Sequence, residues 1–391
     1  MIGPGQIIVA GLLAFVLAAP ASANERLFAQ WFGYLSHVED DWKIVAEQGQ
    51  ATVVSITRKR AEQTNPAKRI LVLYPRASSA YDIAISKVLD VFETKELNAH
   101  FTVINFELKD ERGKAAILFA EQNKFDLIFS MGSESTAWLY DHYRGGSIPV
   151  VSICSKDPVQ LGQAKDYEQG SGSNIAFTSL NMPVEVQMAY ILDLKPELKN
   201  LAILVDSKNI SAVQTQAEPI AAYAKQKNIE IIMGSVQNSA KASEELAQIV
   251  PNAVRTMRKN DPDLSKSIFL ITGSTSVFRE IRTINEKADR VPVVSMIPEI
   301  VKSGQDSAVL AMGISFESNA HLAAIYGADI LTGRAKVNEL KVGIVSPPDI
   351  AISFLKAREI GLRVPFGFFE TATFIYDYEG RPARTSAGKS Q

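Results

Sequence analysis

The sequence predicts an α/β protein made of two lobes, each built on a doubly wound parallel sheet, that are joined by a hinge. Short apolar runs typical of strands alternate with longer helical patterns, and this alternation occurs twice along the chain. The two halves also repeat short motifs in the same order. A chain of 391 residues is longer than one compact core usually requires, so its length fits two lobes.

The first repeat of this alternation begins at residue 67. Its strand candidates are rich in β-branched residues, and apolar residues recur every three to four positions in the segments between them. Such alternation predicts parallel strands with helices on both faces of the sheet. The predicted strands are 69–74, 101–106, 125–130 and 148–153, and the predicted helices are 79–97 and 114–123.

The second repeat begins near residue 181. Its motifs correspond to those of the first, because Gly132-Ser133-Glu134-Ser135 is echoed by Gly273-Ser274-Thr275-Ser276, and residues 148–152 by residues 291–295. We interpret the two halves as structurally equivalent lobes. The predicted helices of the second half are 184–194, 212–226 and 243–259, and its strands are 201–205, 230–233 and 268–272.

The chain is expected to cross between the lobes three times, near residues 174–178, 304–308 and 336–341. A helix at 318–331 then belongs to the first lobe. The expected first lobe is 67–177 plus 306–335, and the expected second lobe is 178–305 plus 336–378.

The first 23 residues differ in character from the rest. An apolar run from Ile7 to Ala19 is followed by Ala21-Ser22-Ala23, which is typical of a signal peptide cleaved after Ala23. The run is short for a spanning helix, but no Lys or Arg precedes it, so an uncleaved anchor is the alternative. Export predicts a periplasmic protein. Cys154 is the single cysteine, so an intramolecular disulfide is excluded.

Residues 24–66 form an N-terminal extension that holds Trp31 and Trp42, two of the three tryptophans. We expect it to pack as an extra helix on the first lobe, and docking onto a membrane partner is the alternative. At the other end, the aromatic segment 366–378 is expected to add a strand to the second lobe. Residues 379–391 are expected to be a disordered tail.

The loops that follow the predicted strands form the candidate site. In open α/β sheets, ligands bind beyond the carboxyl ends of the strands, so two facing lobes would enclose a cleft lined by loops from both. Small polar residues dominate these loops, and the following helix N-termini suit a carboxylate or another anion. Helix capping alone also explains most of these serines. The polar and apolar candidates are Ser78, Ser79, Ser133, Glu134, Ser135, Ser155, Asn209, Ser211, Ser274, Thr275 and Met296.

Charged and aromatic residues complete the candidate set. Asp157, Asp206 and Glu299 are candidates for binding an ammonium or hydroxyl group of the ligand, with a capping or surface carboxylate as the alternative. Tyr74 and Phe316 are candidates for an aromatic wall, although core aromatics at strand ends would have the same pattern.

Composition and motifs argue against other classes of protein. A net charge of −2 without a long run of like charge gives no support for a nucleic-acid partner. G-x-S-x-G, H-E-x-x-H and C-x-x-C motifs do not occur. No histidine follows a predicted strand, where a general base would be needed. We therefore expect a monomer that is not an enzyme and has no catalytic residue, metal or cofactor, although a mechanism based on carboxylates alone stays open.

Several motifs resemble the ABC transporter substrate-binding proteins of the TrpX-like type, over about residues 67 to 365. The resemblance implies a type I periplasmic-binding fold whose strand-end loops contact a solute, aromatic amino acids among them. The chain departs from the family at Gly273-Ser274, where an acidic or amide pair is usual, and this departure weakens the case for an amino-acid ligand. The resembling segments are 154–159, 182–185, 194–199, 201–206, 291–295, 302–304 and 361–365.

The resemblance and the predicted cleft together predict a periplasmic solute-binding component of an ABC importer. It would bind a small polar or aromatic solute, an amino acid included, and deliver it to an ABC permease in the inner membrane. The alternative is a periplasmic ligand sensor that partners a membrane sensor kinase or cyclase. Hinge closure with micromolar-range affinity is expected in either case.

Overall fold

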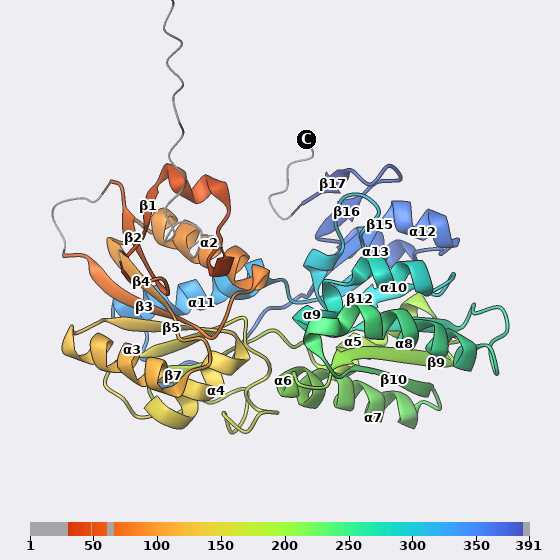
Figure 1. Ribbon diagram of the computed structural model, residues 1–391, viewed down its shortest axis with the longest axis horizontal. Helices are drawn as coiled ribbons and strands as arrows, with labels where there is room; N and C mark the ends of the chain where they lie inside the picture. The colour runs from red at the N-terminus through yellow and green to blue at the C-terminus, as the bar shows by residue number, and fades with distance from the viewer. Residues whose placement is uncertain (1–29, 48, 61–65, 386–391) are drawn as a thin grey trace, which may run out of the picture.

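The computed structural model describes residues 30–47, 49–60 and 66–385 and shows two lobes side by side, each with a mainly parallel sheet (Figure 1). Helices cover both faces of each sheet, which confirms the α/β fold class expected from the sequence. The predicted signal peptide lies outside the described residues. Within the described ranges, no helix combines the length and apolar character needed to cross a membrane.

The first lobe contains a seven-stranded sheet with the order β1-β2-β4-β3-β5-β6-β7. The strands from β4 to β7 are parallel, and β1 and β2 are antiparallel additions at one edge. The central strands are almost fully buried, as β-branched runs covered on both faces should be. The strands are β1 (Trp42–Ala46), β2 (Val53–Arg58), β3 (Lys68–Tyr74), β4 (Ala99–Asn105), β5 (Leu127–Met131), β6 (Val150–Ile153) and β7 (Ile175–Ala176).

Four α-helices cover this sheet, two on each face. One pair includes α11, which comes from late in the chain and packs against α2. Gly327 of α11 lies so close to Phe129 that a Cβ there would be 2.5 Å from the ring, so a glycine is needed for this contact. The pairs are α2 (Ser79–Thr94) with α11 (Phe316–Leu331), and α3 (Asp110–Gln122) with α4 (Gly132–Tyr143).

Most of the described N-terminal extension forms a β-hairpin and not the expected extra helix, although residues 30 and 31 are helical; residues 24–29 lie outside the described residues. Strand β2 pairs with β4, and β1 pairs with β2. Trp42 is buried and packs edge-on against Phe101, with ring centroids 5.5 Å apart. Before the hairpin and the short helix η1 (Ser36–Asp40), Trp31 packs against Tyr74. The hairpin is favoured because β1 and β2 bury mainly alternate residues, a period that suits a strand and not a helix.

The second lobe contains an eight-stranded sheet with the order β10-β9-β11-β12-β13-β15-β16-β17. Strands β10 to β13 are parallel, β15 runs antiparallel to β13, and β16 is parallel to β15. The strands are β9 (Asn200–Asp206), β10 (Glu230–Val236), β11 (Ser267–Ile271), β12 (Val293–Ser295), β13 (Leu310–Gly313), β15 (Asp349–Ser353), β16 (Phe374–Tyr376) and β17 (Pro382–Arg384).

The helices of the second lobe also pack on both faces of its sheet. Leu246 and Ile284 share a core with Phe269 on one face, and Ile191 and Ile220 pack on the other. The longer helices are α5 (Val184–Leu194), α7 (Glu218–Gln226), α8 (Ala242–Met257), α10 (Ile281–Lys287) and α12 (Phe354–Ile360). The shorter ones are α6 (Ile210–Ala212), η2 (Val213–Ala217), η3 (Ser239–Lys241), α9 (Thr275–Phe278), η4 (Pro298–Ile300) and α13 (Phe366–Thr371).

The C-terminal region differs from the expectation in two ways. The segment 366–378 contains the expected strand, β16, but helix α13 precedes it. Strand β17 lies in the segment expected to be disordered and pairs with β16, so the chain is ordered through this pair. Residues 386–391 lie outside the described residues.

The chain crosses between the lobes at three places, two of them later than expected. The apolar run that forms β13 belongs to the second sheet, so residues 310–313 lie in the second lobe and the crossing follows at Ile314. Residues up to Ile344 stay beside the first lobe, because Gly343 N–H donates to Phe177 O at 2.8 Å. The crossing segments also contain η5 (Val337–Glu339) and a short parallel ribbon of β8 (Thr178–Ser179) with β14 (Gly343–Ile344).

Candidate ligand-binding site

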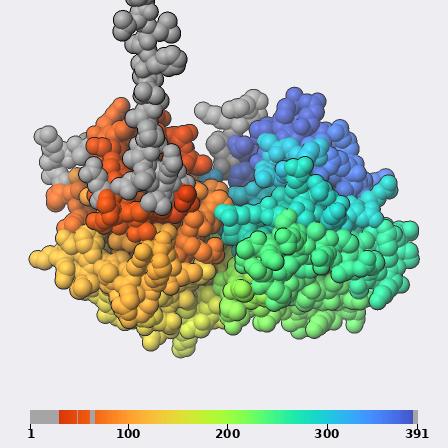
Figure 2. All heavy atoms as spheres, in the orientation of Figure 1, coloured from red at the N-terminus to blue at the C-terminus, as the bar shows by residue number. Residues whose placement is uncertain are grey.

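A cavity lies between the lobes, where the carboxyl ends of both sheets meet. Figure 2 shows the lobes in contact along their seam. The space open to water inside the cavity is about 50 Å³, enough for a few water molecules. It is lined by Arg76, Ser78, Ala80, Tyr81, Gly132, Ser133, Glu134, Cys154, Lys156, Leu180, Asn209, Ser211, Gly273, Thr275, Phe278 and Phe316.

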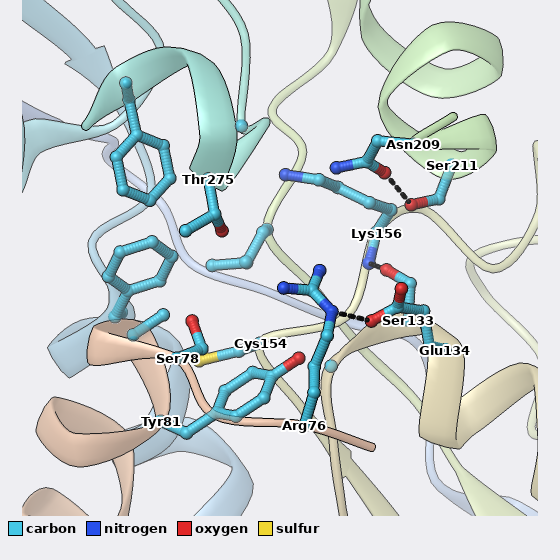
Figure 3. Close-up of a pocket in the computed structure, with 16 residues that line it drawn as sticks. Arg76, Ser78, Tyr81, Ser133, Glu134, Cys154, Lys156, Asn209, Ser211 and Thr275 are labelled. Carbon is cyan, nitrogen blue, oxygen red and sulfur yellow. Dashed lines mark hydrogen bonds and ion pairs between the residues drawn. The ribbon is translucent and has the colours of Figure 1, made fainter. Parts of the chain in front are cut away.

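The loop after β3 and the start of α4 supply an ion pair on the first-lobe wall. Arg76 Nε donates to Glu134 Oε2 at 2.8 Å (Figure 3). Both side chains are about 41% exposed, so solvent weakens their attraction, and the pair serves chiefly to neutralise the charge of Glu134.

Gly132 opens α4 in a conformation that other residues avoid. Its φ of +78° lies in the left-handed region, and a Cβ there would be 2.0 Å from the hydroxyl oxygen of Tyr81. The glycine therefore permits Tyr81 to lie beside the cavity. Burial raises the pKa of Tyr81, so its hydroxyl stays protonated at neutral pH.

Lys156 follows β6 and extends across the seam (Figure 3). Its backbone N–H donates to Ser133 Oγ at 2.9 Å, and the residue is only 4% exposed. A Cβ on Gly273 would lie 2.1 Å from Lys156 Nζ, so the ammonium group lies against the backbone of the second lobe. Burial lowers the pKa of Lys156 to about 8, although the neighbouring Cys154 opposes the shift.

Polar caps from the second lobe and aromatic rings from both lobes form another part of the cavity wall. Asn209 Oδ1 accepts from Ala212 N–H at 3.2 Å and from Ser211 Oγ at 3.0 Å, so it holds the turn after β9. The rings of Phe278 and Phe316 lie 6.5 Å apart between centroids, and Phe316 begins α11. The wall therefore offers hydrogen-bonding groups at one side and an apolar surface at the other.

The chemistry of the cavity suits noncovalent binding. Burial raises the pKa of the Cys154 thiol well above its ordinary value, so the thiol is protonated and a poor nucleophile. In the part of the chain that the structure describes, no group of three or more His, Cys, Asp or Glu residues is placed to hold a metal ion. The cavity instead gathers hydroxyl groups, an amide, aromatic rings and charged side chains from both lobes.

The comparison with protein families agrees with this geometry. The family model of the ABC transporter substrate-binding proteins matches residues 92–371. This chain belongs to that family. Among curated proteins, none matches this sequence.

Solved structures share the fold of this family member at low sequence identity. A conserved domain protein from Vibrio cholerae has a TM-score of 0.62 at 19% identity, covering 80% of this chain and 100% of its own. An ABC domain in complex with L-Trp from Streptococcus pneumonia has a TM-score of 0.59 at 16% identity, covering 79% and 100%. A substrate-binding protein with adhesive properties from Clostridium difficile, in a ligand-free open form, has a TM-score of 0.58 at 17% identity, covering 78% and 98%.

The structure brings part of the predicted site together and places the rest outside the cavity. Both glycines of the repeated motif, Gly132 and Gly273, line it from opposite lobes. The predicted residues in the lining are Ser78, Ser133, Glu134, Asn209, Ser211, Thr275 and Phe316.

Two predicted carboxylates outside the lining hold loops in place. Asp157 accepts from the backbone N–H of Val159 and Gln160 and from the hydroxyl of Tyr167. Asp206 accepts from the hydroxyls of Ser239 and Ser276 at 2.6 and 2.5 Å. These partners satisfy both carboxylates within their own lobes, so neither is directed at a ligand.

Glu299 also lies outside the lining. Its Oε1 accepts from Phe316 N–H at 2.6 Å, so the carboxyl supports the first residue of α11. Its Oε2 is buried and has no hydrogen-bond partner in the described structure.

The remaining predicted residues outside the lining belong to the core or to helix starts. Tyr74 is fully buried and packs against Tyr81, and Met296 is buried in the second-lobe core. Ser135 and Ser274 hydrogen-bond within their own lobes, Ser155 is buried, and Ser79 is exposed at the start of α2.

Sequence reasoning missed several lining residues. Arg76, Cys154 and Lys156 lie in the expected loops, but small hydroxyls and acids were preferred there as candidates. Tyr81 and Phe278 lie three positions after Ser78 and Thr275. Helical side chains lean toward the helix N-terminus, so a large residue one turn after the start of a helix is a signal that could have found both.

Proposed function

We propose that this protein binds a small solute between its lobes, by hinge closure, and delivers it to an ABC permease in the inner membrane. The observation that carries the proposal is that the equivalent loops at Gly132 and Gly273 line one cavity. A solute there contacts both lobes and therefore favours the closed form over the open one. Membership of the substrate-binding family supports delivery to a permease.

The lining favours a solute with a polar group and an apolar or aromatic body. Tyr81, Phe278 and Phe316 offer ring surfaces, and Ser133 and Thr275 offer hydroxyl groups. The L-Trp bound by the streptococcal protein is consistent with an aromatic solute in a cavity of this architecture. Amino acids are therefore included among the compounds to be tested.

A periplasmic location is part of the proposal. The apolar run that ends near Ala19 and the Ala21-Ser22-Ala23 motif support export and cleavage after Ala23. Sequencing the N-terminus of the protein recovered from a periplasmic extract should give Asn24 as the first residue. An intact Met1 on membrane-bound protein would instead support an uncleaved anchor.

Thermal-shift screening of the mature protein against amino acids, small organic acids and purines tests the binding function, followed by calorimetric titration of each hit. We expect micromolar-range dissociation constants. Ser211→Trp, which fills the cavity from the second-lobe wall, should abolish the thermal shift. Ser243→Trp, on the exposed face of α8, is the matched control and should not. Absence of any hit, or equal binding by Ser211→Trp, would remove the main support for this function.

A ligand sensor that partners a membrane kinase or cyclase is the alternative role for the same cavity. The two roles differ in the membrane protein that responds to the loaded protein. Stimulated ATP hydrolysis by a permease reconstituted in vesicles supports transport. A response confined to a sensor kinase or cyclase supports signalling.

A further inference from the structure

Lys156 is a buried cation in the cavity for which the described structure supplies no anion. The residue is 4% exposed, and its hydrogen bond to Ser133 uses the backbone N–H and leaves the ammonium group unused. No described carboxylate forms an ion pair with it. The pKa of about 8 leaves the side chain mostly charged at neutral pH. An unpaired buried charge is costly, so an anion that pairs with this ammonium group would be favoured in the cavity.

The acidic groups near Lys156 are already engaged. Glu134 is the one carboxylate in the lining, and Arg76 neutralises it at 2.8 Å. The Cys154 thiol is held protonated by burial. Glu299 lies outside the lining, and burial raises its pKa to about 8, so it too is mostly uncharged at neutral pH. The cavity therefore has one positive charge in excess.

Three long helices begin at the cavity and add to its positive potential. Ser78 is the N-cap of α2, Gly132 is the first residue of α4, and Phe316 is the first residue of α11; these helices have 16, 12 and 16 residues. The dipole of a helix N-terminus favours an anion, although in α11 the N–H groups of Phe316 and Ser318 already donate to Glu299 and Ser315. Together with the unpaired ammonium group, the helix N-termini make the cavity suited to a negatively charged group.

We propose that the solute is a small organic carboxylate without an amino group, and that Lys156 is its counter-ion. This inference rests on the proposed binding function and specifies its ligand. The carboxylate pairs with Lys156 at the seam, and the apolar body lies against Tyr81, Phe278 and Phe316, with the lobes further apart than here because the present space of about 50 Å³ holds only a few water molecules. An α-ammonium group has no counter-ion here, since Glu134 is paired with Arg76.

Matched compounds separate the charge of the solute from its shape. The probes are 3-phenylpropanoate, its neutral amide 3-phenylpropanamide, and L-phenylalanine, which adds the ammonium group. Acetate, benzoate and indole-3-acetate, each with its primary amide, extend the series in size, and inorganic phosphate tests for binding of any anion. We expect at least one carboxylate to bind about 30-fold or more tightly than its amide, and phosphate not to compete.

Lys156→Met tests the role of the ammonium group, with Lys165→Met, exposed in the same lobe, as the matched control. Lys156→Met should weaken binding of the carboxylate about 30-fold or more, without lowering the melting temperature of the free protein, because it removes an unpaired buried charge. Lys165→Met should bind as wild type does. A merely structural lysine would give the opposite pattern, with lower stability and unchanged carboxylate-to-amide preference.

The outcomes distinguish this inference from the proposed function. If amides or amino acids bind as tightly as carboxylates, or if carboxylates bind Lys156→Met unchanged, the inference is overturned and the binding function stands. If phosphate binds in place of the carboxylates, the site recognises anions in general and the assignment to carboxylates is overturned. If no compound of this series or of the wider screen binds, both are overturned.

Discussion

At the scale of single residues, Glu299 combines one satisfied carboxyl oxygen with one buried and unpaired oxygen. Burial raises the pKa of Glu299 to about 8, and the charge of Asp349 contributes to this rise. Backbone hydrogen bonds to the carboxyl group, including that from Phe316, oppose this shift. In the unfolded chain the pKa is near the ordinary 4.5. The stability that the protonated carboxyl gives is therefore complete below pH 4.5 and is lost as the pH rises through 8.

Glu299→Gln removes this pH dependence, because the amide keeps an acceptor for Phe316 N–H and cannot ionise. The difference in free energy of unfolding, variant minus wild type, should increase by on the order of 2 kcal/mol between pH 5 and pH 8. This value is smaller than the full pKa shift would give, because Glu299 is partly exposed and solvent screens its charge. Urea denaturation at pH 5, 6.5 and 8 measures the difference. A constant difference over this range would contradict the assigned shift.

Gly273 is required for the position of Lys156 and not for a backbone turn. The Cβ of Gly273→Ala would lie 2.1 Å from Lys156 Nζ, the far end of a flexible side chain that can move away. We therefore expect little change in melting temperature. The solute should bind about tenfold more weakly than to wild type, or more weakly still, as measured by calorimetry. Gly367→Ala is the control, since nothing lies within 4 Å of the added Cβ. Unchanged binding by Gly273→Ala would mean that Lys156 does not act from this position.

The residues of the site differ in how far the sequence could reveal them. Ser78, Asn209 and Thr275 follow strands directly, so local pattern was sufficient to find them. Lys156 could not be selected in that way, because its importance comes from its reach to Gly273, which is 117 positions away in the chain. Asp206 is a candidate because of its charge, but its partners Ser239 in η3 and Ser276 in α9 are brought to it only by the fold.

At the scale of elements, the hairpin β1–β2 is the main addition to the first lobe. Trp42 connects it to the sheet through Phe101, and Arg58 donates to both carboxyl oxygens of Glu93 on α2 at 2.6 Å. This pair of hydrogen bonds fixes the hairpin against a helix as well as a strand. No residue of the hairpin lines the interlobe cavity.

Trp42→Ala should therefore separate stability from binding. Removal of this buried ring should lower the free energy of unfolding by about 3–5 kcal/mol, as measured by denaturant titration. Solute affinity, measured at a temperature where the variant is folded, should equal that of wild type. Trp42→Phe, which keeps an aromatic contact with Phe101, should lose less stability. Weakened binding by the folded variant would show that the hairpin influences the cavity.

Which elements could be predicted depends on how they are buried. Strands such as β5 and β9 are buried along their whole length, and their continuous apolar runs were recognised as strands. The aromatic residues of the extension do not by themselves distinguish a hairpin from a helix, although β2 buries alternate residues as a half-buried strand does. Residues 310–313, which form β13, fall within the expected first lobe but lie in the second, because a crossing position depends on tertiary pairing, here with β12 and β15.

At the scale of the whole molecule, crossing segments tie the lobes together beside the cavity. Asn319 of α11 accepts from Cys154 N–H at 2.7 Å and donates to Ser179 O at 3.1 Å, so the first-lobe helix holds both a cavity loop and a crossing strand. Asn181 Nδ2 donates to Thr215 O of the second lobe at 2.6 Å. Through the bond to Cys154, which lines the cavity, this network links the cavity to the crossing segments.

The buried charge of Lys156 predicts the balance between open and closed forms. Closure without solute buries the ammonium group against Gly273, so in the free protein this cost favours an open arrangement in which water reaches the group. Lys156→Met removes the cost, and the free variant should have a smaller radius of gyration in X-ray scattering than free wild type. Lys165→Met should match wild type, since its side chain is exposed. Equal radii for Lys156→Met and wild type would show that desolvation of this lysine does not oppose closure.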